Sequence, residues 1–409
     1  RANFEYDRIT GWFGGYLFYI STDVLRIQEA LPIPLFPVIP ADSTQSSTQG
    51  LVGISSKNYA LFGDITVELT EKLKINLGAR YDWESFDTPT VELSFDVDPP
   101  DCIINPAVPG FGGQLCSEVF ATVIPGLSSS FEAFLPRGAI IYEFDEDRSL
   151  SFTFSRGYRA GGVDLTFTGG INELFNTFDP EFLNNFELAF RSVWPDTGIT
   201  FNANVFYSQW TDQQVIVPVS GENFSDPITL NAGESELYGV ELSADAKVTS
   251  KLTVFANMGL LWTEFVDFQF AVDGNGDPVN AADPQFANLD GNSFNSSPRF
   301  NAAAGVTYQD DNGLFGNANI SYSSAQFSDV TNLPQNRGDT LFLVNARVGY
   351  DFGNFILAAF VDNLFDNRAV LRRNTGNVQR DVGAVVENSN PSFTVNEPRL
   401  WGVEARLRF

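Results

Sequence analysis

The sequence predicts an all-β protein, a transmembrane antiparallel up-and-down β-barrel. Three observations predict it. Apolar and polar residues alternate along many segments, short polar turns alternate with long irregular loops, and aromatic residues gather near strand ends. The alternating segments run for roughly 10 to 14 residues, a length that crosses a bilayer when tilted. A spanning sheet has to close, because an open edge would leave unpaired N–H and C=O groups in hydrocarbon.

The expected strands are recognised by their period of two. In the segment 73–83, Leu77 and Tyr81 share one face and Arg80 belongs to the other. The same alternation fills residues 59–69, 199–208, 300–308 and 342–350. At the end of the chain it places on one face Trp401, Val403, Ala405, Leu407 and Phe409. Strand spacing explains these segments and helical spacing does not.

The connections between the strands come in two kinds. Short polar turns are expected at 70–72, 145–148, 195–198, 249–251, 310–313 and 352–354. Long loops cover roughly 23–56, 87–129, 160–179, 218–233, 269–297, 325–339 and 366–398. Turns and loops therefore lie at opposite ends of one meander of about 14 strands. A β-propeller would show a repeat of about 40 to 50 residues, which is not seen, and a β-sandwich of this length would divide into several domains.

The polar residues of the alternating segments are expected to line the lumen. Charged side chains are intolerable toward lipid but ordinary around a wet or plugged interior. The lumen-lining candidates are Arg80, Glu187, Arg191, Glu241, Arg347, Glu404 and Arg406. Aromatic residues at strand ends are expected to form girdles at the membrane surfaces: Tyr19, Trp83, Trp194, Tyr207, Trp210, Trp262, Tyr322, Tyr350 and Trp401. The chain contains no run of 18 apolar residues that could form a transmembrane helix.

Composition excludes several classes of function. With 24 Lys plus Arg against 51 Asp plus Glu, the net charge of −27 argues against a nucleic-acid partner. The absence of His removes the commonest acid–base residue and the commonest metal ligand. We therefore expect no enzyme, no cofactor and no metal site. The single Met is Met258, so Arg1 is not an initiator, and we expect a processed chain or a fragment.

Two loop features are candidates for a binding site or a covalent link. Cys102 and Cys116 lie in a Gly/Pro-rich loop, which favours a disulfide in an oxidising compartment over two unlinked thiols. The segment DGNGD at 273–277 resembles the start of a calcium loop, but Pro278 and Pro284 occupy the positions that need Gly and Glu. A turn-rich loop is the better interpretation, with a looser calcium site as the alternative.

Several segments in series resemble the TonB-dependent outer-membrane receptors, in their siderophore-receptor branch. They are SRGYRAGG (155–162), DPEFLNNFELAFRS (179–192), FNANVFYSQWTDQQV (201–215), NAGESELYGVELSA (231–244) and VDNLFDNR (361–368), followed by the aromatic closing strand. The matches keep the family order from about residue 136 to 409. The resemblance implies a 22-stranded barrel around an N-terminal plug domain. Residues 1–409 would then be a partial barrel domain that lacks the plug and the first strands, unless another chain supplies those strands.

The resemblance also implies a function and partners. Such receptors import a scarce nutrient across the bacterial outer membrane with energy from TonB, ExbB and ExbD, so a ferric siderophore is the favoured ligand. Alternatives are an oligosaccharide, a vitamin or another small organic molecule. Two further alternatives are a passive porin-like or structural barrel without a plug, and a soluble extracellular all-β protein. Haem receptors of this family typically carry a Phe-Arg-Ala-Pro pattern and His ligands. Here Tyr158-Arg159-Ala160 is followed by Gly161 and the chain has no His, so haem is disfavoured.

Two sets of residues receive candidate roles. The loop residues Arg368, Arg372, Arg373 and Arg380 could contact an anionic ferric complex or lipopolysaccharide phosphates. Pairing with Asp366 and Asp381 is the favoured alternative, because most loop charges are simply solvated or paired. By resemblance, the barrel-assembly machinery would read a signal formed by Trp401, Leu407 and Phe409 at the end of the last strand.

Overall fold

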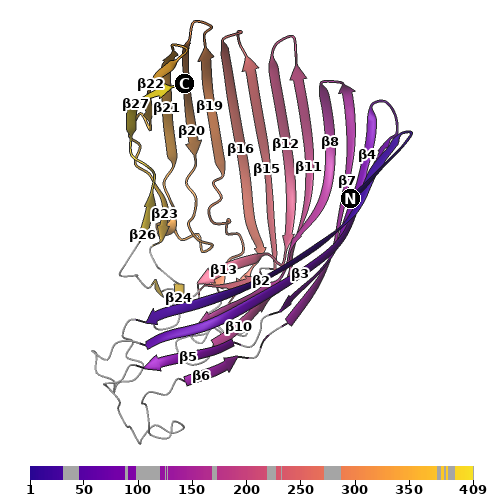
Figure 1. The fold of residues 1–409 in the computed structure, drawn as a ribbon, viewed down its shortest axis with the longest axis vertical. Helices are drawn as coiled ribbons and strands as arrows, with labels where there is room; N and C mark the ends of the chain where they lie inside the picture. The colour runs from indigo at the N-terminus through magenta and orange to yellow at the C-terminus, as the bar shows by residue number, and fades with distance from the viewer. Residues whose placement is uncertain are drawn as a thin grey trace, which may run out of the picture.

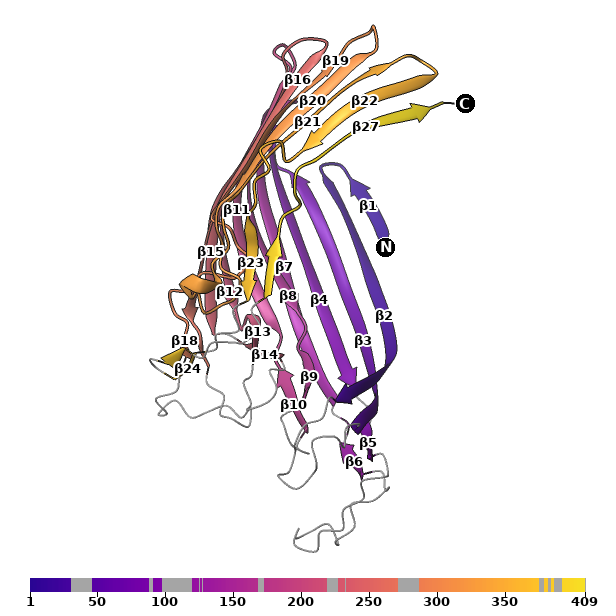
Figure 2. The same ribbon diagram turned by 90° about the vertical axis from the view of Figure 1, so that its left-hand side faces the viewer.

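The structure is a computed structural model, and it describes most of the chain. The described residues are 1–30, 46–87, 91–97, 120–124, 126, 128–167, 173–218, 227–231, 233–270, 287–374, 379–381, 384–385 and 392–408. They form one large curved sheet with small hairpins at one end (Figures 1 and 2). One short 3₁₀ helix, η1 (Pro334–Asn336), is the only helix in these ranges. No helix of the described part could span a membrane.

The elements are bounded as follows. The first strands are β1 (Ala2–Tyr6), β2 (Ile9–Ala30), β3 (Ser46–Glu68), β4 (Leu73–Asp87), β5 (Val91–Val97), β6 (Phe120–Ile124), β7 (Ser128–Asp145), β8 (Arg148–Arg159), β9 (Gly162–Phe167), β10 (Glu173–Phe178), β11 (Glu181–Trp194), β12 (Ile199–Thr211), β13 (Gln214–Pro218) and β14 (Pro227–Asn231). The later strands are β15 (Glu234–Lys247), β16 (Leu252–Asp267), β17 (Gln269–Phe270), β18 (Ala287–Asn288), β19 (Phe300–Gln309), β20 (Leu314–Ser323), β21 (Leu341–Asp351), β22 (Phe355–Asp362), β23 (Val370–Asn374), β24 (Gln379–Asp381), β25 (Ala384–Val385), β26 (Ser392–Val395) and β27 (Leu400–Leu407).

The main sheet is an antiparallel meander, as the sequence predicts. Its neighbours follow the order β1, β2, β3, β4, β7, β8, β11, β12, β15, β16, β19, β20, β21, β22 and β27, while β5 and β6 extend the loop end of β3. All six expected turns join consecutive strands of this meander. Gly313 and Gly353 adopt positive φ in two of these turns, a conformation that glycine tolerates best.

One strand is added to the expected meander at its beginning. Asp7 adopts a left-handed φ of 52° and starts a tight turn between β1 and β2. The opening segment is therefore a hairpin. At the other edge of the sheet, β27 pairs with β22 (Figure 2). Within the described residues, β1 and β27 each pair on one side only.

The strand register separates the sheet into two chemically different faces. On the outer face large apolar side chains are exposed, such as Leu61 at 62% and Val348 at 57%. Aromatic rings of neighbouring strands touch near the loop end in the pairs Tyr81–Phe134, Phe186–Tyr207, Tyr238–Trp262 and Phe300–Tyr322. Near the turn end, Phe190 and Phe201 touch across neighbouring strands, and Tyr142–Phe144 and Tyr350–Phe352 touch within one segment of the chain. Two aromatic belts around an apolar band are typical of membrane barrels.

The sequence predicts Trp210 in the aromatic girdle, but the structure places it on the inner face. It pairs in register with Ser235, on the face opposite to Tyr207 and Tyr238. Its ring packs edge-on against Phe294 at 6.2 Å, inside the curve of the sheet. Its position near the end of β12 predicts a girdle residue. The register nevertheless places its side chain on the inner face, because successive side chains point to opposite sides of a strand.

Several glycines let aromatic rings lie flat on the inner face. A Cβ on Gly239 would stand 2.6 Å from the Phe206 ring, and one on Gly305 would stand 2.5 Å from the Phe255 ring. Each glycine is the register partner of the aromatic residue that covers it. The rings therefore fill the space of the missing side chains, and the inner face is packed even where it carries glycine.

Candidate functional site

The candidate site is the inner face of the sheet together with the segments at its loop end. The strand register places all seven lumen-lining candidates on this inner face: Arg80, Glu187, Arg191, Glu241, Arg347, Glu404 and Arg406. That this face borders a water-filled or plugged lumen stays a prediction.

The charged residues of the inner face form small networks across strands. Arg347 Nη1 lies 2.9 Å from Glu404 Oε2, and Arg406 contacts the same carboxylate at 3.4 Å. Arg191 donates to the Asn204 side chain, whose amide in turn donates to Glu241. These pairs are partly exposed, so each contributes little to stability. They leave the inner wall polar and close to locally neutral.

A polar knot ties together the loop ends of β8, β11, β12 and β15. Asn231 accepts a hydrogen bond from the N–H of Asp179 at 2.8 Å and donates to the carbonyls of Asp179 and Asp212 at 2.9 and 2.7 Å. Asp212 adopts a positive φ of 55° at the bend that makes its carbonyl available. Glu181 accepts the N–H of Gln214 at 2.5 Å. We call Asp179, Glu181, Asp212, Gln214 and Asn231 the knot.

The knot brings the resemblance motifs together in space. Residues 155–162, 179–192, 201–215 and 231–244 each supply a member or a partner. Arg159 forms an ion pair with Glu181 at 2.9 Å, and Gln214 donates to the carbonyl of Ala160 at 2.8 Å. These motifs therefore fix the positions at which the loops leave the sheet.

An apolar cluster lies beside the knot on the inner side. It consists of Val215, Phe265, Phe268, Leu289 and Val330, with Leu230 and Phe294 packed against it. The side chains come from three separate loop-end segments, and Phe265 and Phe268 are each 1% exposed. We call these seven residues the hub. It fixes the described residues around 215, 230, 265–268, 289–294 and 330 relative to one another.

Asparagine side chains hold the segments around the hub in place. Asn332, at a φ of 53°, accepts the N–H of Ser293 at 2.7 Å and donates to its carbonyl at 2.9 Å. Asn292 donates to the carbonyl of Val330 at 3.0 Å. Backbone groups that no strand could satisfy are thus paired by side chains, as buried segments require.

The arginines of the last loop differ in their surroundings. Arg368 pairs with Asp366 at 3.0 Å, and Arg373 pairs with Asp339 at 2.9 Å. Arg372 is exposed. Arg380 belongs to β24, and its side chain lies outside the described part of the structure. The expected pairing with Asp366 is present for Arg368, whereas the partner of Arg373 is Asp339, which belongs to the preceding long loop.

Two carboxyl groups in these loop-end segments are held ionised. The N–H of Val370 and the guanidinium of Arg373 hold the pKa of Asp339 below its ordinary value of 3.8. The N–H of Arg399, with Arg368, lowers the pKa of Asp366 in the same direction. Both acids therefore remain charged at neutral pH and clamp the segments that carry the arginines.

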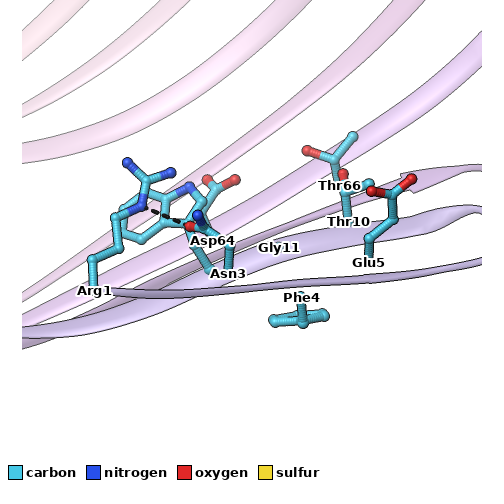
Figure 3. A pocket seen from close by; sticks show the side chains of 9 residues that line it. Arg1, Asn3, Phe4, Glu5, Thr10, Gly11, Asp64 and Thr66 are labelled. Atoms are coloured by element: carbon cyan, nitrogen blue, oxygen red, sulfur yellow. Dashed lines mark hydrogen bonds between the residues drawn. The ribbon is translucent and has the colours of Figure 1, made fainter.

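A shallow cavity of about 480 Å³ lies near the turn end, beside β1 (Figure 3). It is lined by Arg1, Asn3, Phe4, Glu5, Thr10, Gly11, Trp12, Asp64 and Thr66. Arg1 donates to Asn3 at 3.1 Å, and its guanidinium covers the Trp12 ring at 4.3 Å. Figure 3 shows Phe4 on the other side of the strand from Arg1 and Asn3. The cavity follows the edge of the sheet and is open to solvent along it.

Some predicted features fall outside the described residues. They are Cys102, Cys116, Phe409 and the segment 273–277. Trp401 and Leu407 are described, and both lie exposed on the outer face of β27, at 75% and 65%. No group of three or more acidic, Cys or His side chains able to hold a metal occurs in the described ranges.

Comparison with known proteins decides the family. The family model "TonB dependent receptor-like, beta-barrel" matches residues 1–364. The chain belongs to this family. It is therefore part of a TonB-dependent receptor barrel, an integral β-barrel of the bacterial outer membrane. The outer face with its aromatic belts is the lipid-facing surface of this barrel.

Solved structures agree with this fold. The chain is similar to the ferric yersiniabactin uptake receptor FyuA from Yersinia pestis, with 18% identity, a TM-score of 0.69, and coverage of 99% of this chain and 52% of that one. It is also similar to the ferric-catecholate import receptor Fiu from E. coli K12, with 14% identity, a TM-score of 0.63, and coverage of 100% of this chain and 53% of that one. The siderophore receptor PiuA from Acinetobacter baumannii is similar as well, with 15% identity, a TM-score of 0.63, and coverage of 98% of this chain and 54% of that one. The TonB-dependent receptor chain described here spans about half the length of each.

Sequence reasoning missed the knot and the hub as units. The motifs that contain the knot residues were recognised, but a single sequence does not show which motifs meet in space. The hub residues are ordinary apolar residues of short strands, strand ends and loops, and alternation within one segment does not show that they meet. The one available signal was the group of Asn and Asp residues near the strand ends, since these types bond to nearby backbone and tolerate positive φ.

Proposed function

We propose that the protein imports a scarce nutrient through the outer membrane with TonB-coupled energy, and that a ferric siderophore is its ligand. Membership of the TonB-dependent receptor family carries this proposal. Support for the ligand comes from similar proteins named for ferric siderophore uptake. The chemistry fits too, because a siderophore brings its own iron ligands, so a chain without His needs no metal site of its own.

Copper is a second candidate cargo, because the chain is also similar to the copper transporter OprC (13% identity, TM-score 0.59). Copper sites in proteins favour imidazole, thiolate and thioether ligands. This chain has no His, its single Met258 lies on the outer face, and the disulfide expected between Cys102 and Cys116 would leave no thiolate. We therefore retain the ferric complex.

The proposal assigns roles to the parts of the site. The hub and the knot hold the loop-end segments as a preformed binding rim, and the exposed Arg372 is the described arginine best placed to meet an anionic complex. The seven inner-face charges line the transport path. Residues 1–409 act as one barrel domain, with a plug domain, TonB, ExbB and ExbD, the barrel-assembly machinery and lipopolysaccharide as partners. Catalysis has no part in this proposal.

Uptake by whole cells tests the proposal. The full-length receptor is expressed in a receptor-deficient strain, and uptake of radiolabelled iron is measured with hydroxamate, catecholate and phenolate siderophores. We expect saturable uptake of at least one complex, lost when TonB is deleted. Uptake that persists without TonB would instead support a passive porin-like barrel. Uptake of oligosaccharides or vitamins but of no iron complex would refute the proposed ligand.

A further inference from the structure

The wall of the barrel divides between β7 and β8. The two strands pair from the turn up to Arg137 and Ser155, and no pair between them follows in the described residues. Beyond that point β7 still pairs with β4, and β8 still pairs with β11. Pro136 is the first β7 residue past the last pair with β8, although it still pairs with Ala79 of β4. We call this gap, between 128–136 of β7 and 156–159 of β8, the seam.

Side chains at the seam show how the two halves of the wall are displaced. By alternation Tyr158 shares the outer face of β8 with Phe154. Yet its hydroxyl donates to Glu84, on the inner face of β4, at 3.0 Å. A Cβ on Gly161 would stand 2.6 Å from the ring of Phe131, an inner-face residue of β7. The loop end of β8 therefore lies inside the wall formed by β4 and β7.

The overlap encloses a polar cluster that joins the two halves. Asp82 is 1% exposed and is held by Arg80. Asn58 donates to both Asp82 and Glu84, at 3.2 and 3.3 Å. Ala133, 2% exposed, is the small β7 residue at this crossing. We call the overlapped arrangement, closed by Tyr158 and Glu84, the latch.

The latch leaves groups unsatisfied that a continuous wall would pair. The facing edges of β7 and β8 lack strand partners along the seam. Arg156 lies over the Phe182 ring at 4.4 Å, but its buried Nε has no partner within the described structure. Unpaired strand edges and buried polar atoms both cost stability. The latch therefore competes with an arrangement in which the seam closes.

That second arrangement is defined by the existing register. Extending the pairing of Arg137 with Ser155 along both strands would set Glu132 opposite Ala160 on the outer face. We propose that the seam is a gate with two states. In the latched state the loop end of β8 lies inside the wall and narrows the interior. In the zipped state β8 returns to the wall, pairs with β7 and widens the interior.

Disulfide trapping distinguishes the two states, because Glu132 and Ala160 can meet only when the seam is zipped. In the latched state Glu132 lies on the outer face, where it accepts the Tyr81 hydroxyl at 2.8 Å, whereas Ala160 precedes Gly161, which lies against the inner-face residue Phe131. The pair Glu132→Cys with Ala160→Cys is placed in the full-length receptor, with Cys102 and Cys116 replaced by Ser. Oxidation is followed in outer-membrane vesicles, which requires no transport activity.

Two substitutions provide the comparison. Tyr158→Phe removes the latch hydrogen bond. Tyr207→Phe removes a similar Tyr–Glu bond, to Glu236 at 2.7 Å, far from the seam. We expect the Cys pair to crosslink slowly when Tyr158 is present. The crosslinking rate should rise roughly fivefold with Tyr158→Phe, because one hydrogen bond of the latch is lost. It should stay unchanged with Tyr207→Phe. No crosslinking in either background, immediate crosslinking in all of them, or equal acceleration by both substitutions would overturn the gate.

Discussion

At the scale of single residues, side chains in this protein mostly satisfy backbone groups that the sheet leaves free. Asn231 makes three such bonds in the knot, to Asp179 and Asp212. Asn363 does the same between β22 and the last loop, where it donates to the carbonyls of Asn367 and Glu397. A short amide side chain suits this role because it donates and accepts at once.

Replacing Asn231 with Ala should loosen the loop end of the sheet. The change removes three hydrogen bonds and leaves backbone groups of Asp179 and Asp212 without them, so we expect a loss of about 1–3 kcal/mol in unfolding free energy. The temperature at which heating converts the folded gel band to the unfolded one measures this loss of stability. Asn204→Ala, on an exposed inner-face network, is the matched control and should change little. Equal effects of the two changes would contradict the role of the knot.

Asp339 should make the stability of the protein depend on pH over a defined acidic range. The folded-state pKa of Asp339 lies below the ordinary value, so its contribution is complete above that value and is lost as the pH falls through the lowered pKa. We expect Asp339→Asn to lower the thermal midpoint by a constant amount from neutral pH to about pH 4, and by less at lower pH. A difference that does not change down to about pH 2 would show that the carboxylate is not responsible.

At the scale of elements, the sequence predicts the turns and the faces well. The six short turns and the alternation of β4, β12 and β21 are all present. These features depend on residues that are close in the chain. The first hairpin, the inward position of Trp210, the hub and the seam depend on pairing between distant segments, which alternation alone does not report.

The covered glycines should be intolerant of any side chain. A Cβ on Gly239 would stand 2.5 Å from the carbonyl oxygen of Leu260 and 2.6 Å from the Phe206 ring. We expect Gly239→Ala to cost about 1–3 kcal/mol, as overpacking does, measured by the same heat-dependent gel shift. Gly259→Ala is the control, because nothing lies within 4 Å of its added Cβ. Similar stability of both variants would mean that the rings move aside freely.

At the scale of the whole molecule, one sheet separates two environments. Its outer face carries aromatic belts and exposed apolar side chains, and its inner face carries paired charges, amides and glycines covered by rings. The composition of the chain, with its many aromatic residues, reflects that division. The sequence predicts the division because a barrel wall repeats it in every strand. The ligand stays a proposal because the rim depends on loops that carry no such repeat.

The last strand should matter for assembly. Trp401 and Leu407 are exposed on the lipid-facing side of β27, as a signal read by another protein requires. We expect deletion of Phe409 to reduce severalfold the amount of protein inserted in the outer membrane, assayed by fractionation and heat-modifiable mobility. Substitution of Phe409 by Trp, which keeps an aromatic side chain at this position, is the control. Undiminished insertion of the deletion variant would exclude this role.

The division into a lipid-facing and a lumen-facing side can be measured directly on β12. Single Cys residues are placed at Asn202, Ala203, Asn204 and Val205 of the full-length receptor, with Cys102 and Cys116 replaced by Ser, in outer-membrane vesicles. Reaction of each Cys with a water-soluble maleimide measures its access to water. Collision of a spin label at the same Cys with oxygen dissolved in lipid measures its contact with lipid. The account predicts maleimide reaction at 202 and 204 and lipid contact at 203 and 205. Uniform reaction at all four positions, or the reverse alternation, would contradict it.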